Sequence, residues 1–318
     1  MRFLLDTEQR AFADSLGALL KAADTPGVIR EWSRGDHRSG RALWGRVAEA
    51  GVFALAVPEA YEGLGPRPVD LAVAFVELGR HAVPGPLVET VAAAALLVDP
   101  GPAKRFLPAL ASGESMATVA YQGAYALDGD AAAVRLSLAP DGLRLAPGAD
   151  PAPVRPSLDP ARRLIRLRPG GELLTATPPT DRALLWARLA TAAQALGVGL
   201  ALLDRTVAYV GQRTQFGVPV GSFQAVKHRL ADARIALEFA RPLVLGAAVT
   251  MAPADVAAAK VSACEAAYAT ARTALQSHGA LGYTAEYDLS LWLTKARALR
   301  TAWGTPQECR ADVLTARA

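Results

Sequence analysis

The chain has 318 residues, of which 52% are hydrophobic and 20% are charged, and its formal net charge is +4. This composition excludes a disordered chain and favours packed helices, and the length suits two or three subdomains. The arginines are spread through the chain without a cluster, which argues against nucleic acid and membrane surfaces as partners. A pocket for an anionic ligand remains possible.

The remaining compositional signals exclude other classes of protein. The two cysteines, Cys264 and Cys309, lie in helix-like sequence and indicate neither a disulfide framework nor a zinc site. The first residues, MRFLLDTEQRAFAD, lack a signal architecture, and we find no uninterrupted apolar stretch of membrane-spanning length. We therefore expect a cytoplasmic protein without a metal.

The first third of the chain reads as helical. Asp6 and Gln9 form a predicted capping box, and helical periodicity follows it. Further helices are predicted up to Gly51, over 69–80 and after the prolines at 84–86, whereas VFALAVPEAYEGLG predicts a short extended piece and a loop. Residues 1–112 should form an N-terminal helical domain.

The pattern changes after this domain. Residues 113–179 contain short alternating runs such as AVRLSLAPDGLRLAP and RRLIRLRP, separated by turn residues, and they predict a small β domain. Residues 180–318 return to long helical patterns, one to about 213, one over 223–250 and one over 254–278, and predict an antiparallel bundle. The predicted fold class is mainly α with a short middle β domain.

Four stretches of the sequence resemble the acyl-CoA dehydrogenase family. They are AEAGVFALAVPEAYEGLG at 48–65, RTQFGVPVGSFQAVKHRLAD at 213–232, QSHGALGYTAEYDLSLWLTKAR at 276–297 and GTPQ at 304–307. The R-x-x-F-G run followed by a Phe-Gln pair is the most specific of them. With the domain order, the resemblance covers nearly the whole chain.

The resemblance implies an FAD site that is shared across a subunit interface. In the family, the arginine of the R-x-x-F-G motif contacts the FAD pyrophosphate of a neighbouring subunit, a pairing that suits guanidinium chemistry, and it matches Arg213 here. The other cofactor-binding residues carried over in this way are Gln215, Phe216, Gln224, Gln276, Gly279, Ala280, Gly304, Thr305 and Gln307. Ala280 stands where the family has a second glycine, which departs from the pattern.

The family's catalytic base is missing from both of its known positions. Family members remove the α-proton of an acyl-CoA with a glutamate while a hydride passes from the β-carbon to the flavin. An ungapped count places Trp303 at the commoner position of this glutamate and Ala187 at the rarer one. Arg188 matches an arginine near the CoA-bearing end of the substrate, and a solvated arginine at a helix start is the other interpretation of it.

The middle domain also departs from the family. The flavin-contacting strand should lie near Ala120, but the sequence there is TVAYQGAYAL, and the domain is short. Glu308, Glu286 and His278 are acid or base groups nearby, and each is read as a solvated or structural residue. No catalytic residue is assigned to this chain.

Three functional hypotheses follow. The chain resembles the reduced subunit of heteromeric bacterial acyl-CoA dehydrogenases of the steroid side-chain type, which pairs with a full-length, base-bearing subunit in a heterotetramer. The second hypothesis is a homo-oligomeric flavoprotein that acts on a specialised thioester with an unrecognised base. The third is a binding or scaffold protein that has lost FAD. The first hypothesis accounts for most of the sequence.

Overall fold

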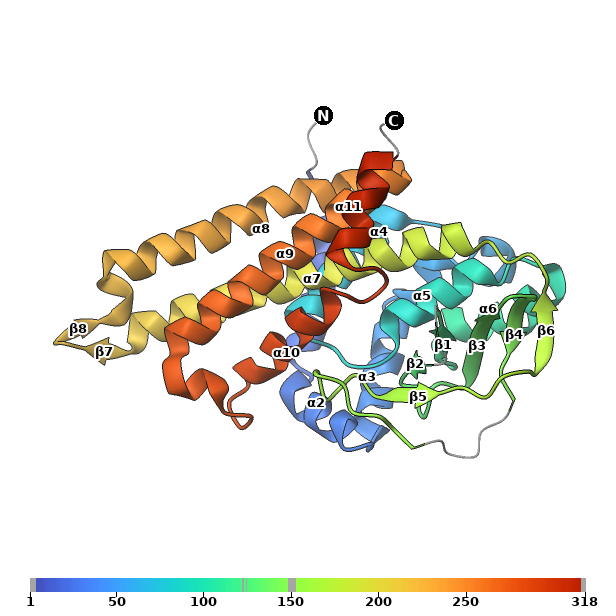
Figure 1. Ribbon diagram of the computed structural model, residues 1–318, viewed down its shortest axis with the longest axis horizontal. Coiled ribbons are helices and arrows are strands. Elements are labelled where there is room, and N and C mark those ends of the chain that lie inside the picture. The colour runs from blue at the N-terminus through green and yellow to red at the C-terminus, as the bar shows by residue number, and fades with distance from the viewer. Residues whose placement is uncertain (1–3, 122, 124, 148–152, 316–318) are drawn as a thin grey trace. The chain divides into compact units, whose positions relative to one another are not determined.

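The computed structural model describes residues 4–121, 123, 125–147 and 153–315. Helices come first, short strands follow, and long helices close the chain (Figure 1). This order confirms the predicted fold class.

The N-terminal helices lie between residues 7 and 111. They are α1 (Thr7–Lys21), α2 (Thr25–Ser33), α3 (Arg38–Glu49), α4 (Pro68–Arg80), α5 (Leu87–Leu96) and α6 (Pro100–Ala111). The capping box before α1 is confirmed, because the Gln9 N–H donates to Asp6 Oδ1 at 2.8 Å and the Asp6 N–H donates to Gln9 Oε1 at 3.1 Å. Both bonds satisfy donors that a helix start leaves unpaired.

The short extended piece predicted in residues 52–65 is present at Val57 and Pro58, but most of the segment around it is not extended. The segment forms two 3-10 turns, η1 (Phe53–Ala56) and η2 (Glu59–Tyr61). All four residues of η1 are buried, and the Leu64 N–H donates to Ala54 O at 2.9 Å. The returning loop thus satisfies η1 backbone, so no strand partner is needed.

The middle strands form a four-stranded sheet in the order β1-β3-β4-β6. The strands are β1 (Ala117–Ala120), β2 (Tyr125–Leu127), β3 (Val134–Ala139), β4 (Gly142–Leu145), β5 (Leu164–Arg166) and β6 (Glu172–Thr175). β1 and β3 are parallel, the other neighbours in this sheet are antiparallel, and β2 pairs with β5 outside it.

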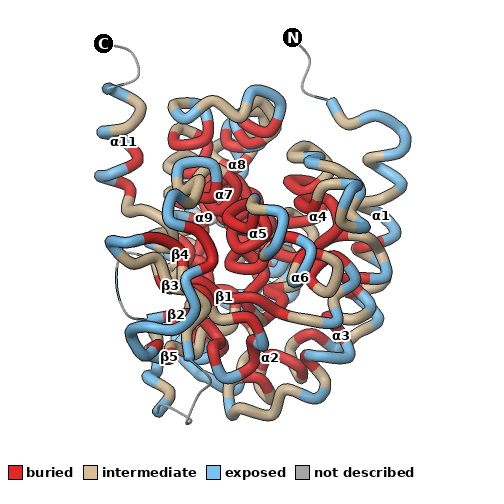
Figure 2. Tube along the Cα trace, turned by 90° about the vertical axis from the view of Figure 1, so that its right-hand side faces the viewer, coloured by how far each residue is buried: buried red, intermediate tan, exposed pale blue. Residues whose placement is uncertain are grey.

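The Thr90 hydroxyl of α5 donates to Ala117 O and accepts from the Ala117 N–H, each at 3.1 Å, which fixes α5 to β1 (Figure 2 shows both elements buried).

The C-terminal helices include three long ones. The elements are α7 (Thr180–Gln212), β7 (Thr214–Gln215), β8 (Val218–Pro219), η3 (Val220–Ser222), α8 (Gln224–Thr250), α9 (Pro253–His278), η4 (Gly279–Tyr283), α10 (Leu289–Leu299) and α11 (Pro306–Thr315). α8 and α9 lie side by side and α11 packs on α9 (Figure 1). α7 is long and apolar enough to cross a membrane, but 89% of its apolar window is buried inside the protein, as in a core helix.

The chain forms two compact units. The first contains residues 4–20, 72–82 and 191–315, and the second contains residues 21–71 and 83–190. The domain boundaries at 112 and 179 remain predictions from the sequence.

Two glycines, one on each helix, let α4 and α7 pack closely in the first unit. A Cβ at Gly79 would lie 2.1 Å from Gln194 O, and a Cβ at Gly197 would lie 1.9 Å from Val76 O. Each glycine therefore lets the facing backbone approach where a side chain would collide. Arg80 adds an ion pair to Asp204 at 3.0 Å across the same two helices.

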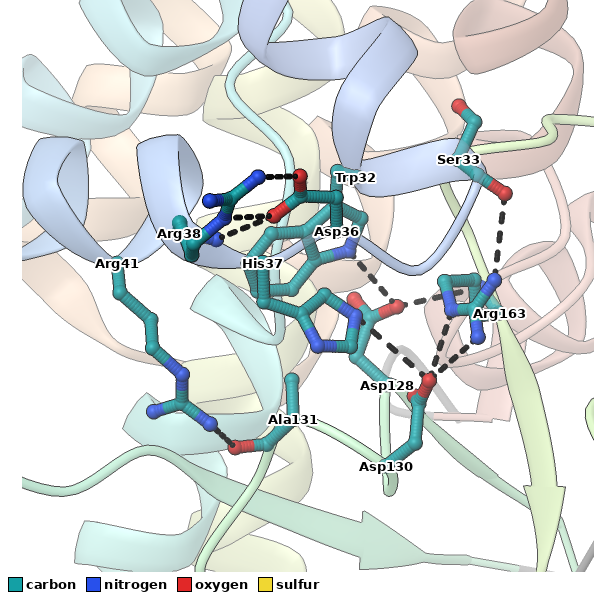
Figure 3. Close-up of polar contacts among 10 residues, drawn as sticks. All are labelled: Trp32, Ser33, Asp36, His37, Arg38, Arg41, Asp128, Asp130, Ala131 and Arg163. Carbon is teal, nitrogen blue, oxygen red and sulfur yellow. Dashed lines mark hydrogen bonds and ion pairs between the residues drawn. The ribbon is translucent and has the colours of Figure 1, made fainter.

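A buried carboxyl fixes α2 to the β2–β5 region in the second unit (Figure 3). Asp128 Oδ1 accepts from Trp32 Nε1 at 3.1 Å and from the Arg163 N–H at 3.2 Å, while Oδ2 has no partner among the described residues. Arg163 in turn donates to Asp130 Oδ2 at 2.6 Å and to Ser33 O at 3.2 Å. Burial raises the pKa of Asp128 to about 7, and the hydrogen bonds from Trp32 and Arg163 only partly oppose it.

The glycine contact predicts a position-specific effect within α7. Gly197→Ala should lower the free energy of unfolding by about 2–4 kcal/mol, because the helix backbones must separate. Gly211→Ala, in the same helix with nothing within 4 Å of its Cβ position, should raise it by about 0.5–1 kcal/mol. Denaturant unfolding measures both variants, and equal effects would contradict the assigned contact.

The buried carboxyl predicts a pH-dependent stability. The folded protein holds the Asp128 proton more tightly than the unfolded chain, so this residue's contribution is full below about pH 4 and is lost as the pH rises to about 7. Asp128→Asn mimics the protonated form and should be more stable than the wild type at pH 8, by on the order of 1–3 kcal/mol, with a smaller difference at pH 5.

Thermal unfolding from pH 5 to pH 8 measures this difference. Asp141→Asn is the matched control, because Arg144 hydrogen-bonds to that exposed carboxyl and holds its pKa below the ordinary value. Its pH dependence above pH 5 should therefore follow the wild type. A pH-independent difference for Asp128→Asn would show that this carboxyl is ionised in the folded protein.

Candidate functional site

The R-x-x-F-G motif forms the β7–β8 hairpin between α7 and α8. Phe216 and Gly217 occupy its two-residue turn with φ of 55° and 80°. Two positive φ values are those of a type I′ turn, where a non-glycine residue is strained by about 1–2 kcal/mol. The hairpin closes through the Val220 N–H, which donates to Arg213 O at 2.7 Å, and it leaves the Phe216 side chain 90% exposed.

A hollow of about 410 Å³ lies beside this hairpin, between the start of α8 and the end of α9. It contains residues from the two most specific sequence motifs, which are far apart in the chain. Its lining consists of Arg213, Gln215, Val220, Ala225, Val226, Arg229, Gln276, Ser277, His278 and Gly279. The structure therefore brings together four of the predicted cofactor residues, Arg213, Gln215, Gln276 and Gly279.

The electrostatic character of this hollow is positive. The Arg213 guanidinium donates to the Tyr209 hydroxyl and lies 5.7 Å from the centre of its ring, which orients it at the end of α7. Arg229, on α8, adds a second guanidinium to the lining. No carboxylate belongs to the described lining of the hollow, so an anionic group such as a phosphate fits there.

His278 supplies a buried polar atom to the same hollow. Its ring is fully buried and stacks on Tyr209 with centroids 4.0 Å apart. Nδ1 lies 2.8 Å from Ala274 O, a contact that requires the proton on Nδ1, and Nε2 has no partner among the described residues. Desolvation lowers the pKa of His278 and so favours the neutral ring, in which Nε2 is closed off from solvent.

Gly279 and Ala280, at the end of α9, differ in backbone conformation. Gly279 has φ 60° and ψ −137°, a conformation open to glycine, and its N–H donates to Leu275 O to end the helix. Ala280 has a negative φ in η4 and is exposed. The replacement of the family's second glycine by Ala280 therefore introduces no backbone strain.

Other predicted cofactor residues lie outside the lining of this hollow. Phe216 is at the hairpin tip and Gln224 is the exposed first residue of α8. Gly304, Thr305 and Gln307 lie where α11 begins. Sequence reasoning missed Arg229. Its signal was a cation one helical turn after Ala225, a residue that also lines the hollow.

The segment before α11 is a strained turn with its own cap. Trp303 has φ 58° and Gly304 has φ 128°, and a bulky residue in the left-handed region is strained by about 1–2 kcal/mol. The Thr305 N–H donates to Glu308 Oε2 at 2.6 Å and the Glu308 N–H donates to Thr305 Oγ1 at 3.2 Å. Glu308 is thus a capping residue, as the sequence indicated.

The residues carried over to α7 lie in the second unit. Ala187 is fully buried and the Arg188 side chain is only 8% exposed. The interpretation of Arg188 as a solvated arginine at a helix start is therefore wrong, because a buried guanidinium persists only with partners. The nearby strand β1 is buried at all four positions.

Comparison with known proteins identifies the family. The family profile for the acyl-CoA dehydrogenase N-terminal domain matches residues 6–114, and that for the C-terminal domain matches residues 180–317. The acyl-CoA dehydrogenase IpdE2 of Mycolicibacterium smegmatis is 33% identical over 307 residues, which cover 96% of this chain and 97% of the relative. The chain belongs to the acyl-CoA dehydrogenase family. Members of this family are FAD flavoproteins and oxidoreductases.

Solved structures of the family share the fold of this acyl-CoA dehydrogenase family member. The Tcur3481–Tcur3483 steroid ACAD variant is 25% identical, with a TM-score of 0.81 over 97% of each chain. The ChsE4–ChsE5 complex from Mycobacterium tuberculosis has a TM-score of 0.84 at 23% identity, over 99% of this chain and 98% of that one. The resemblance drawn from the sequence is therefore confirmed.

Proposed function

We propose that this chain is the base-lacking subunit of a heteromeric FAD-dependent acyl-CoA dehydrogenase, which introduces an α,β double bond into an acyl-CoA thioester. One observation carries this proposal. An ungapped count along the sequence places Trp303 and Ala187 at the two positions where the family has its glutamate. An indole and a methyl group cannot take the α-proton, so the base must come from another chain.

The cofactor proposal rests on the chemistry of the hollow. Two guanidinium groups, those of Arg213 and Arg229, suit a pyrophosphate. Arg213, Gln215 and Gln276 would hold part of the dinucleotide, with Phe216, Gln224, Gly279, Ala280, Gly304, Thr305 and Gln307 as the further contacts carried over from the family. Bound FAD supplies the hydride acceptor of the reaction.

The contribution of this chain is binding and orientation. In a shared site, Arg213 neutralises phosphate charge and the hollow excludes solvent from one part of the cofactor, while the partner places the base beside the α-carbon. Arg188, a buried cation in the second unit, is proposed to neutralise an anionic group of the acyl-CoA. The assembly is proposed to be a cytoplasmic heterotetramer.

The comparisons support a two-chain assembly. IpdE2 matches along its full length, so the short middle domain is shared by a curated acyl-CoA dehydrogenase. Two of the solved structures with this fold are named as pairs of gene products, Tcur3481–Tcur3483 and ChsE4–ChsE5. The first is named as a steroid ACAD, which favours a bulky polycyclic or side-chain thioester as substrate.

The cofactor assignment predicts a selective loss of flavin. Arg213→Ala should sharply weaken FAD retention in the active assembly, because it removes a charge-assisted contact to the pyrophosphate. Arg234→Ala is the matched control. This exposed arginine of α8 forms an ion pair with Glu238, with 2.9 Å between Nε and Oε1, and it does not belong to the described lining of the hollow. Flavin absorbance per mole of purified protein measures both, and unchanged flavin content in Arg213→Ala would remove this residue from the site.

The companion role is tested by purifying the chain alone and after co-expression with a full-length acyl-CoA dehydrogenase subunit encoded beside it. Flavin absorbance and subunit stoichiometry are measured in each preparation. We expect FAD only in the co-purified complex, and acyl-CoA oxidation that disappears when the partner's base is replaced. Stoichiometric FAD and activity in the lone chain would instead favour a homomeric enzyme, and no flavin in either preparation would favour a scaffold protein.

A further inference from the structure

We propose that Lys260 is a positioning residue that holds the turn at residues 300–305 in the geometry its cofactor role requires. The inference rests on the proposed function in one respect only, the assignment of Gly304, Thr305 and Gln307 to the shared FAD site. Among the described residues, no hydrogen-bond partner of Lys260 belongs to the lining of the hollow. It acts through the backbone of the turn.

The geometry around Lys260 is that of an ammonium enclosed by carbonyl groups. The side chain lies on α9 and is 1% exposed. Nζ donates to Gly304 O at 2.7 Å and to Arg300 O at 3.4 Å, and Cys264 Sγ lies 4.0 Å away. Within the described part of the chain, Nζ forms no ion pair with a carboxylate. Burying such a charge is unfavourable unless hydrogen bonds compensate it, so these bonds are the reason the lysine can be buried.

The carbonyl groups that Lys260 contacts need a donor. α10 ends at Leu299 and α11 begins at Pro306, so the carbonyls of Arg300 and Gly304 lie between the two helices, where donors from outside the segment can reach them. A cation at a helix C-terminus also complements the negative end of the helix dipole. Lys260, on α9, provides both the hydrogen-bond donor and the positive charge. Its two bonds fall on either side of Trp303. The ammonium thus clamps the turn at its beginning and its end.

The turn is strained enough to need a clamp. Trp303 and Gly304 have consecutive positive φ values, and a bulky residue keeps such a conformation only when its surroundings fix it. α9 holds the same turn a second time, because Glu265 accepts from Arg300 Nε at 2.7 Å. Lys260 therefore decides where the backbone of Gly304 and Thr305 points, while Glu265 fixes the side chain that precedes them.

The experiment compares Lys260→Met with the wild-type chain, alone and in the co-purified complex. Methionine keeps the length and apolar stem of the side chain and removes its charge. We expect hydrogen exchange at the Thr301, Ala302 and Thr305 amides to rise by about tenfold or more, because their turn loses its clamp. We also expect the Kd for FAD in the complex to rise by about tenfold, with unchanged exchange at the end of α9 around Gln276.

A chemical rescue distinguishes positioning from packing. Lys260→Ala leaves a cavity in which propylammonium can replace the ammonium, whereas n-propanol fills the space without the charge. Restored protection of the turn by propylammonium but not by n-propanol supports the proposal. Thr270→Val is the control on the same helix, since its buried hydroxyl donates to Ala266 O of α9 at 2.8 Å, and its exchange at the turn should match the wild type.

The two hypotheses fail in different ways. If the wild-type complex holds no FAD, the proposed function fails, while exchange at the turn still tests Lys260 on its own. If FAD binds and the turn exchanges equally in wild type and Lys260→Met, the positioning role is overturned. It is also overturned if exchange rises evenly over all helices, or if n-propanol restores the turn as well as propylammonium does, because the lysine would then be a general packing residue.

Discussion

The candidate site depends on left-handed backbone at the ends of the long helices. Phe216 and Gly217 reverse the chain between α7 and α8, Gly279 ends α9, and Trp303 with Gly304 turns it into α11. Two of these positions are bulky aromatic residues, so strain is accepted where glycine or asparagine would fit more easily.

Within each of the two units, a buried ionisable group fixes local geometry. Lys260 places an ammonium against carbonyl groups, and Asp128 places a carboxyl against an indole N–H and a backbone N–H. Both contacts lie in a medium of low dielectric, where a satisfied polar group fixes geometry strongly and an unsatisfied one is costly. Asp128 meets this cost by retaining its proton near neutral pH, whereas Lys260 meets it with hydrogen bonds.

The family membership and the proposed absence of the glutamate have to be explained together. Arg213, Gln276 and Gly279 line one hollow, while an ungapped count places Trp303 and Ala187 at the family's positions of the base. Selection that retains a cofactor-binding surface without the proton acceptor is expected when the surface serves a neighbouring subunit. The division of a shared site between two chains accounts for both observations with one cause.

The sequence by itself determined the family, the helical and β regions and the capping box at Asp6, because periodicity and motif spacing are local signals. It did not single out α2 and α6, nor the 3-10 turns on either side of the extended Val57 and Pro58. Only the tertiary structure decided that Arg188 is buried, that His278 and Arg229 join the hollow, and that Lys260 holds the turn at Trp303. Those facts depend on contacts between segments far apart in the chain, which no local pattern encodes.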